Sequence, residues 1–192
     1  MADFKILIPH LLYRETGRKP ISSDAEVAFA GAAAVGVVTL KGDRGGPTFV
    51  GVTLQTFTDY CKKKGLPRPT VQDLGRMDFR TWYDISKSGF WDRCKGDQIA
   101  FQPTANMLVD WCYTSGIHAI TNTQKALGLK ADGIVGPVTL AALNSGTIPV
   151  FLAVKAAREA FYRRIATGAQ SRFLTGWLNR TNAITLNGIN FR

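Results

Sequence analysis

The stretch that decides the fold is Leu11-Leu12-Tyr13-Arg14-Glu15-Thr16-Gly17, because it ends an apolar helical segment with a single acidic side chain. Ile8, Leu12 and Glu15 are spaced at i, i+4 and i+7, so they share one face of a helix. Gly17 follows, and glycine is the residue that most often ends a helix. We therefore predict a helix over residues 3–16 that holds the Glu15 carboxyl at the edge of an apolar core.

Glu15 alone has two interpretations. Most Glu side chains are exposed and take no part in chemistry. Partial burial at the edge of a core raises the pKa of a carboxyl, and a general acid working near neutral pH needs such a raised pKa. The rest of the sequence has to decide between a surface residue and an acid.

The composition is that of a globular protein with a strong positive charge. A chain of 192 residues, 45% of them hydrophobic, is long enough for one domain or one and a half with a sizeable core. Its 24 Lys and Arg exceed its 14 Asp and Glu by a net charge of +10, which favours a polyanionic partner such as nucleic acid, anionic lipid or a bacterial wall. No nucleic-acid-binding motif accompanies the basic residues, so we expect no nucleic-acid partner.

The three cysteines, Cys61, Cys94 and Cys112, are too few and too far apart for a disulfide framework. The chain has no Cys/His spacing typical of a metal site, so we expect neither a metal nor a cofactor. Free thiols suit a protein that folds in a reducing cytoplasm. The N-terminus lacks the pattern of a signal peptide, so another factor must release the protein if its target lies outside the membrane.

Residues 18–42 are the most unusual segment of the chain. Residues 27–40 carry no charge, yet they are too few to span a bilayer. The β-branched second half, residues 35–40, predicts a strand, whereas the first half fits a helix or a strand. We interpret the segment as a buried packing piece, and the alternative is a surface that touches a membrane or a partner.

A glycine-rich turn follows at Asp43-Arg44-Gly45-Gly46-Pro47-Thr48 and indicates a specific backbone path. Asp43 and Thr48 flank this turn, so both side chains are expected to point into one cleft. Apolar stripes then predict helices over roughly 54–64, 78–88, from 104 onward, 119–127, 150–165 and 171–183. The predicted fold is mainly helical, with a small β-hairpin or β-rich element around residues 35–53.

Aromatic residues are the natural platforms for sugars, because a flat ring stacks on C–H groups. Trp82 and Trp91 are candidates for such a platform, but both are equally compatible with a place in the core.

Six motifs in order resemble the glycoside hydrolase family 108 proteins, which are lysozyme-like N-acetylmuramidases, joined to a C-terminal type 3 peptidoglycan-binding region. The motifs are Glu15-Thr16-Gly17, Asp43-Arg44-Gly45-Gly46-Pro47-Thr48-Phe49-Val50-Gly51-Val52-Thr53, Phe90-Trp91-Asp92-Arg93, Leu108-Val109-Asp110-Trp111, Thr123-Gln124-Lys125-Ala126-Leu127-Gly128 and Asp132-Gly133-Ile134-Val135-Gly136-Pro137-Val138-Thr139. The resemblance covers nearly the whole chain apart from residues 18–42, and several motifs in sequence are far more specific than any one of them.

The resemblance implies a lysozyme-like α+β fold with a catalytic region over residues 1–103, in which 18–42 is an atypical insert. It also implies a helical peptidoglycan-binding region over residues 104–192, which we expect to pack with the first into one compact body. The catalytic residues that it implies are Glu15 as general acid, Asp43 as base or electrostatic stabiliser, and Thr48 to orient water. The substrate-binding residues expected from the same motifs are Trp91, Asp92, Thr53, Asp110 and Trp111.

The sequence departs from the family at two points. Thr16 replaces the first glycine after the acid, and Glu15 precedes Asp43 by 28 positions, a longer interval than in the family. A gapless count places Ala34 where the acid should be, which would make the protein inactive. We place a gap instead, because the residues before Glu15 resemble the family's lead-in helix. Glu26, inside the insert, is a rival acid.

The expected function is therefore an N-acetylmuramidase that cuts peptidoglycan between N-acetylmuramic acid and N-acetylglucosamine, as an endolysin or a secretion-associated wall hydrolase. The expected partner is the peptidoglycan glycan strand, with transient contact to anionic membrane or wall polymers, and we expect a monomer. The protein would be made in the bacterial cytoplasm and act on the wall after release or non-classical export. Two alternatives are an inactive peptidoglycan-binding protein and a protein that permeabilises membranes through its apolar insert and cationic helices.

Overall fold

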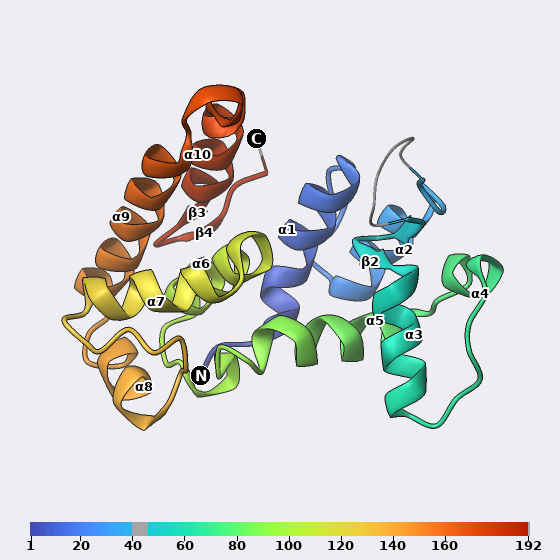
Figure 1. Ribbon diagram of the computed structural model, residues 1–192, viewed down its shortest axis with the longest axis horizontal. Coiled ribbons are helices and arrows are strands. Elements are labelled where there is room, and N and C mark those ends of the chain that lie inside the picture. The colour runs from blue at the N-terminus through green and yellow to red at the C-terminus, as the bar shows by residue number, and fades with distance from the viewer. Residues whose placement is uncertain (40–45, 192) are drawn as a thin grey trace. The chain divides into compact units, whose positions relative to one another are not determined.

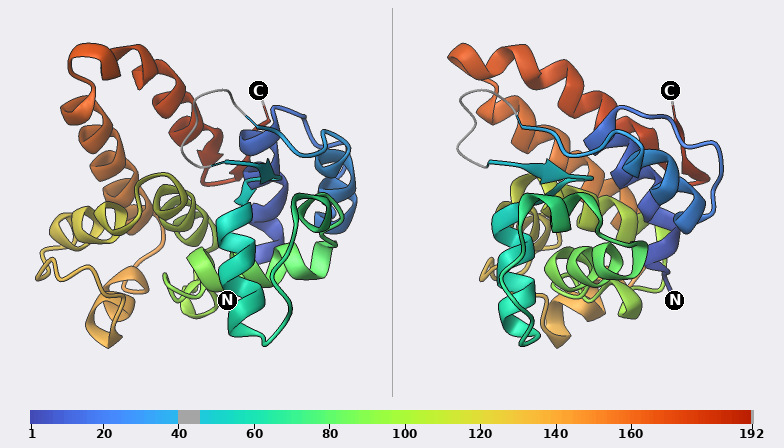
Figure 2. Two further views of the ribbon diagram at one scale, coloured as in Figure 1. Left: turned by 45° about the vertical axis from the view of Figure 1, so that its right-hand side comes forward. Right: turned by 90° about the vertical axis from the view of Figure 1, so that its right-hand side faces the viewer.

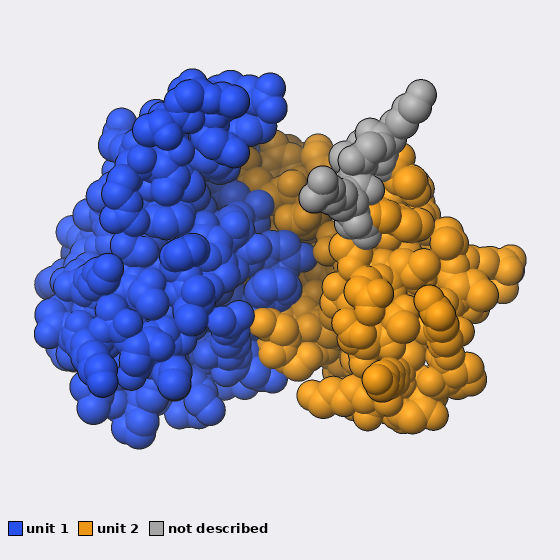
Figure 3. All heavy atoms as spheres, in the orientation of Figure 1, with its two compact units in different colours: residues 1–4, 90–192 blue, residues 5–89 orange. Residues whose placement is uncertain are grey.

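The computed structural model describes residues 1–39 and 46–191, which form two compact units (Figure 3). One unit is Lys5–Gly89, and the other combines Met1–Phe4 with Phe90–Arg192. The predicted boundary between the two regions lies between residues 103 and 104, whereas the two compact units meet between Gly89 and Phe90. That division follows sequence motifs rather than compactness, and it stays a prediction, as does a single compact body.

The unit Lys5–Gly89 consists of helices of up to a few turns and one small hairpin (Figure 1). The helix predicted over residues 3–16 is confirmed by α1, which contains Pro9 within its length. The elements are α1 (Phe4–Thr16), α2 (Ala25–Ala33), β1 (Thr48–Phe49), β2 (Val52–Thr53), α3 (Leu54–Lys63), α4 (Val71–Gly75) and α5 (Phe79–Ser86).

Side-chain caps determine where several of these helices begin. The Asp24 carboxylate accepts hydrogen bonds from two backbone N–H groups at the start of α2, so α2 begins directly after this capping residue. Thr70 and Asp73 form a reciprocal capping box at α4. Asp78 caps α5 by accepting from the Thr81 N–H at 2.8 Å. Each cap satisfies backbone donors that have no partner inside the helix.

The hairpin is antiparallel, with Thr48 opposite Thr53 and Phe49 opposite Val52. Val38 adds a single bridge to Thr48 on the other side. The predicted strand over residues 35–40 is thus reduced to one paired residue among those described, while the first half of the charge-free run is helix α2. Between α2 and residue 39, the backbone pairs with the hairpin at a single residue, which makes an isolated bridge and not a strand.

An aromatic cluster fills the core between α2, the hairpin and α5. The Phe29 ring of α2 lies 6.4 Å from Phe49, 5.6 Å from Phe79 and 5.7 Å from Trp82, measured between ring centroids. Trp82 has no exposed surface, so it belongs to this core rather than to a sugar platform. Residues 25–33 therefore form part of the core of this unit, as the packing interpretation of the insert predicted.

The other unit is helical, with α6 packed against α7 and α9, and α10 packed against α9 (Figures 1 and 2). Its interior contains Trp111 of α6 and Phe161 of α9, whose ring centroids lie 5.8 Å apart. The elements are η1 (Lys87–Trp91), which begins in the first unit, then η2 (Gly96–Gln98), α6 (Gln102–Ser115), α7 (Ile117–Ala126), α8 (Pro137–Leu143), α9 (Ile148–Ile165), η3 (Gly168–Phe173), α10 (Leu174–Ala183), β3 (Ile184–Thr185) and β4 (Gly188–Ile189).

The predicted fold class is confirmed, because helices dominate and the described strands form only two short hairpins. The second hairpin, β3 with β4, was not predicted, since two-residue strands leave no periodic signal in a sequence. Within the described residues no single helix is long and apolar enough to cross a membrane. Only α8 and α9 taken together meet that criterion, and they are bent by 109° relative to each other.

Candidate active site

A cavity of about 460 Å³ lies in the unit Lys5–Gly89, beside the C-terminal end of α1. Three parts of the chain form it: the end of α1, the backbone that follows α2, and the β1–β2 hairpin. The described residues that line it are Glu15, Thr16, Val35, Gly36, Val38, Gly46, Thr48, Val50 and Gly51. Two of the three predicted catalytic residues, Glu15 and Thr48, therefore line one cavity.

Glu15 occupies the last turn of α1, where the helix leaves the core. Ile8 and Leu12, on the same helical face, are buried, whereas Glu15 is exposed at the cavity. Gly17 ends the helix with a positive φ of 70°, and its N–H donates to the Tyr13 carbonyl at 2.8 Å. Among the described residues that line the cavity, Glu15 is the only acid. The sequence pattern thus predicted the position of the carboxylate at the end of an apolar face, whereas the partial burial expected for it is not observed.

Thr48 is fixed by backbone pairing on both sides. It lies opposite Thr53 in the hairpin, and it exchanges two backbone hydrogen bonds with Val38, of 2.8 Å and 2.9 Å. Its hydroxyl lies 3.4 Å from the Gly46 carbonyl, which is long for a hydrogen bond between oxygens. The backbone of Thr48 is therefore held firmly, while its hydroxyl keeps the capacity to bind a water molecule or a sugar hydroxyl.

Three valines give the cavity an apolar side that the sequence analysis did not identify. Val35 and Val38 follow α2 and expose 38% and 42% of their surface, whereas Val50 in the hairpin turn is buried. Half-exposed valines beside a carboxylate offer contact to the C–H face of a sugar and to methyl groups. The charge-free run of residues 27–40 was the available signal, but it did not indicate which residues face the cavity.

The hairpin turn at Val50 and Gly51 is held in an uncommon conformation. Both residues have positive φ, 42° for Val50 and 82° for Gly51, as a two-residue turn between right-twisted strands requires. A β-branched residue rarely adopts such a φ, so the surroundings must hold Val50 there. The Trp82 indole N–H donates to the Val50 carbonyl at 2.9 Å and is the direct contact that does so.

The remaining catalytic candidates lie elsewhere. Asp43 falls outside the described residues, so its predicted role stays a prediction. Glu26 is exposed in the first turn of α2, and neither it nor Ala34, which ends α2, is among the residues that line the cavity. Thr53, predicted to bind substrate, is the N-cap of α3, where its hydroxyl accepts from the Thr56 N–H at 3.1 Å. The observed role of Thr53 is therefore to cap helix α3, and its role in substrate binding stays a prediction.

Trp91 and Trp111 are wrong as substrate-binding predictions, because neither ring has exposed surface. The Trp91 indole donates to the Asp97 carboxylate at 2.7 Å, and a methyl group at Gly96 would lie only 2.3 Å from the Trp91 ring. Trp111 is buried in the helical core against Phe161. A buried ring cannot stack on a sugar, so both tryptophans stabilise the unit that contains residues 90–192.

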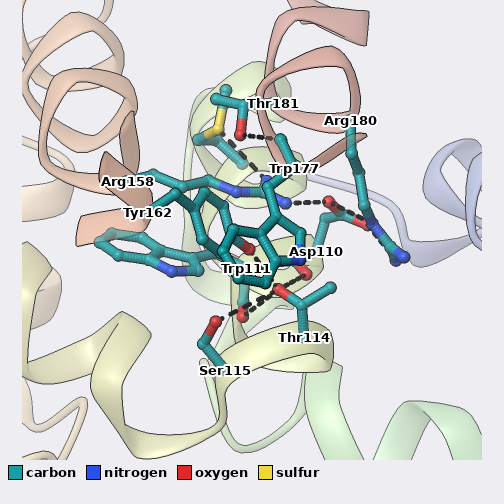
Figure 4. A network of polar contacts seen from close by, with 10 residues as sticks. Asp110, Trp111, Thr114, Ser115, Arg158, Tyr162, Trp177, Arg180 and Thr181 are labelled. Atoms are coloured by element: carbon teal, nitrogen blue, oxygen red, sulfur yellow. Dashed lines mark hydrogen bonds and ion pairs between the residues drawn. The ribbon is translucent and has the colours of Figure 1, made fainter. Parts of the chain in front are cut away.

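Asp110 is also wrong as a substrate-binding prediction, because it is the buried counter-ion of two arginines (Figure 4). One carboxylate oxygen accepts from Arg158 at 2.7 Å, and Arg180 reaches both oxygens at 2.8–3.1 Å. Arg158 is fully buried as well. The motif that suggested a binding residue therefore encodes an ion-pair network that joins α6, α9 and α10.

Asp92 is exposed and lines a separate small cavity of about 170 Å³ with residues 95–98. Its role in substrate binding stays a prediction. No group of His, Cys, Asp and Glu side chains within the described part of the chain is arranged to hold a metal ion. As far as the described residues go, the candidate site thus contains one acid, hydroxyls and an apolar side.

Two sequence families match the chain, one after the other. Residues 32–116 match glycosyl hydrolase 108, and residues 118–182 match a predicted peptidoglycan domain. The first half of the described fold is therefore similar to glycosyl hydrolase 108 proteins, and most of the second half is similar to the peptidoglycan domain. The solved structure of SagA from Brucella abortus is similar, with a TM-score of 0.61 and 26% identity over 81% of this chain and 90% of SagA. No curated protein sequence matches the chain.

The matches to glycosyl hydrolase 108 and to the peptidoglycan domain together support a glycoside hydrolase that acts on peptidoglycan. The order of the two regions is the order that the motifs predicted. The hydrolase match begins at residue 32 and therefore does not include Glu15. Glu15 is assigned to the site because it lines the same cavity as Thr48, which lies in the matched region.

Proposed function

We propose that the protein is an N-acetylmuramidase that uses Glu15 as its general acid to cut between N-acetylmuramic acid and N-acetylglucosamine. The observation that supports this proposal is the shared cavity, which unites the only acid among its described lining residues with Thr48 of the hydrolase region. A glycosidic bond breaks only when its leaving oxygen receives a proton, so one protonated carboxyl at the cleft is the first requirement.

The proposed chemistry assigns one task to each group. The Glu15 carboxyl donates its proton to the glycosidic oxygen while the bond from that oxygen to the anomeric carbon breaks. Positive charge then develops on the sugar ring and needs an anion or an activated water on the other face. We assign that second role to Asp43 on its motif, and we assign to the Thr48 hydroxyl the orientation of the attacking water.

The positive charge of the protein suits the proposed substrate. A net charge of +10 concentrates the protein on a polymer rich in carboxylates and phosphates, and this attraction weakens as salt screens it. We further propose that the protein is made in the bacterial cytoplasm and reaches the wall after lysis or export, as an endolysin or a secretion-associated hydrolase.

The test is the digestion of purified sacculi by the wild type and two matched variants, Glu15→Gln and Glu26→Gln. Both variants remove one exposed carboxylate, but only Glu15 lines the cavity. Mass spectrometry of the soluble fragments should find reducing N-acetylmuramic acid ends from the wild type and Glu26→Gln. Glu15→Gln should release at least about 100-fold fewer fragments than the wild type, because general acid catalysis usually contributes a factor of this size or more.

A non-catalytic peptidoglycan-binding protein is the second candidate. The observation that favours it is the start of the hydrolase match at residue 32, which is compatible with a gapless alignment that puts Ala34 in place of the acid. This candidate predicts that all three proteins bind sacculi and that none releases fragments. Equal release by the wild type and Glu15→Gln would instead place the acid at another residue.

A further inference from the structure

The unit that contains residues 90–192 holds two cysteines side by side in its interior. The sulfur atoms of Cys94 and Cys112 lie 3.0 Å apart, although 18 positions separate them in the sequence. Cys94 follows η1, and Cys112 lies in α6, so the pair connects two different elements. Both side chains are buried. The sequence spacing had suggested isolated thiols, and the fold brings two of the three together.

We propose that Cys94 and Cys112 are a disulfide site, reduced while the protein is in the cytoplasm and oxidised once it reaches the space where the wall lies. A disulfide needs its sulfurs about 2.05 Å apart. The pair is therefore about 1 Å from bonding distance, a shift that small side-chain rotations provide. Cys61 belongs to the unit Lys5–Gly89 and has no part in the site.

The oxidation requires a disulfide as the oxidant, either a small-molecule disulfide or a protein oxidoreductase. One cysteine thiolate attacks the oxidant, forms a mixed disulfide and releases the first thiol of the oxidant. The second cysteine then loses its proton and attacks the mixed disulfide, which releases the second thiol. The protein loses two electrons and two protons in total, and the oxidant is reduced to two thiols.

The surroundings keep the reduced pair unreactive until the chain opens or folds anew. The hydrogen bond from Cys94 to Cys112, together with burial, raises the pKa of the Cys94 thiol well above its ordinary value. A protonated thiol is a poor nucleophile, so oxidation of the folded protein is expected to be slow. Oxidation during folding or refolding outside the cytoplasm avoids this barrier, because the thiols are then accessible.

The bond would close a loop from residue 94 to residue 112 that contains η2 and most of α6. A cross-link of this length stabilises the folded state mainly by restricting the unfolded chain. The chemistry of the pair does not depend on Glu15, whereas the occasion for oxidation rests on the proposed action at the wall. A failure of the muramidase proposal would therefore leave the outcome of the thiol experiment unchanged.

The experiment refolds the full chain from denaturant in a buffer of oxidised and reduced glutathione. Free thiols are then alkylated, and the protein is digested without reduction for mass spectrometry. We expect a cross-linked Cys94–Cys112 peptide, an alkylated Cys61, and a Tm roughly 5–10 °C above that of the reduced protein, with the difference abolished by dithiothreitol. Refolding exposes every thiol, so slow access to the buried pair cannot hide the result.

The matched control is Cys61→Ala, which removes the cysteine outside the pair and should retain both the cross-linked peptide and the redox-dependent shift in Tm. Cys112→Ala should lose both. Because Cys112→Ala also changes a buried site, the deciding comparison is between the oxidised and reduced wild type. Alkylation of all three cysteines after refolding, a cross-link that involves Cys61, or equal Tm values for oxidised and reduced wild type would each overturn the proposal.

Discussion

Substitution of Asp110 by Asn tests whether this residue is a structural counter-ion or a substrate-binding residue. The carboxylate accepts one hydrogen bond from Arg158 and a forked set from Arg180. An amide of the same shape keeps one accepting oxygen but carries no charge, and its NH₂ group would face a guanidinium. The substitution therefore leaves two cations without their common anion.

The two arginines differ in how much this loss costs. Arg180 exposes 13% of its side chain and can regain some hydration, whereas Arg158 exposes none. Removal of one partner from a buried ion pair typically costs 3–5 kcal/mol, because the remaining charge has no solvent. We expect the free energy of unfolding of Asp110→Asn to fall by about 3–5 kcal/mol, with a Tm lower by roughly 10 °C.

Urea denaturation at pH 7, followed by circular dichroism, measures the effect. The matched control is Asp92→Asn, which neutralises an exposed carboxylate and should change stability by less than about 0.5 kcal/mol. The double variant Asp110→Leu with Arg158→Met removes the buried pair together and should recover most of the loss. A loss below about 1 kcal/mol in Asp110→Asn, accompanied by weaker sacculus binding, would refute the structural role and restore the substrate-binding one.

Two further substitutions test the packing of the core, and a change of pH tests a helix cap. Gly96→Ala should lower stability by about 2–3 kcal/mol, because its methyl group would overlap the buried Trp91 ring, and thermal unfolding measures this. Trp82→Phe should cost about 2 kcal/mol in urea denaturation, since the hydrogen bond to the Val50 carbonyl is lost and a smaller ring remains. Acidification should also destabilise the protein. Hydrogen bonds from Thr81 lower the pKa of the Asp78 carboxyl. The stabilising contribution of this carboxylate is therefore present above about pH 4 and is lost as the pH falls through the lowered pKa. Unfolding measured from pH 6 to pH 2 should show this decline, and Asp78→Asn should make it shallower.

Features encoded by neighbouring residues were predicted from the sequence. The apolar face of α1 and the end of that helix at Gly17 depend on positions only a few residues apart. Such signals are local, so periodicity and capping rules identify them directly. The shared cavity of Glu15 and Thr48 was anticipated from motif order, because both motifs belong to one resemblance.

Features that depend on distant partners were not predictable in this way. Asp110 acquires its structural role from Arg158 and Arg180, which lie 48 and 70 positions later in the chain. Trp91 fits a sugar platform and a core equally well until its neighbours are known. Polar and aromatic residues inside a motif have no intrinsic preference between a site and an interior, so the tertiary fold decides.

The contacts of Phe29 make the stretch between the acid and the glycine-rich turn inseparable from the hairpin. A chain shortened there to restore the family's usual interval would lose one member of the aromatic cluster and, with Val38, one edge partner of Thr48. The stretch therefore cannot serve as an adjustable spacer. A designer who transplants this region into another hydrolase has to move α2, the hairpin and α5 together, because the ring contacts of Phe29 join all three.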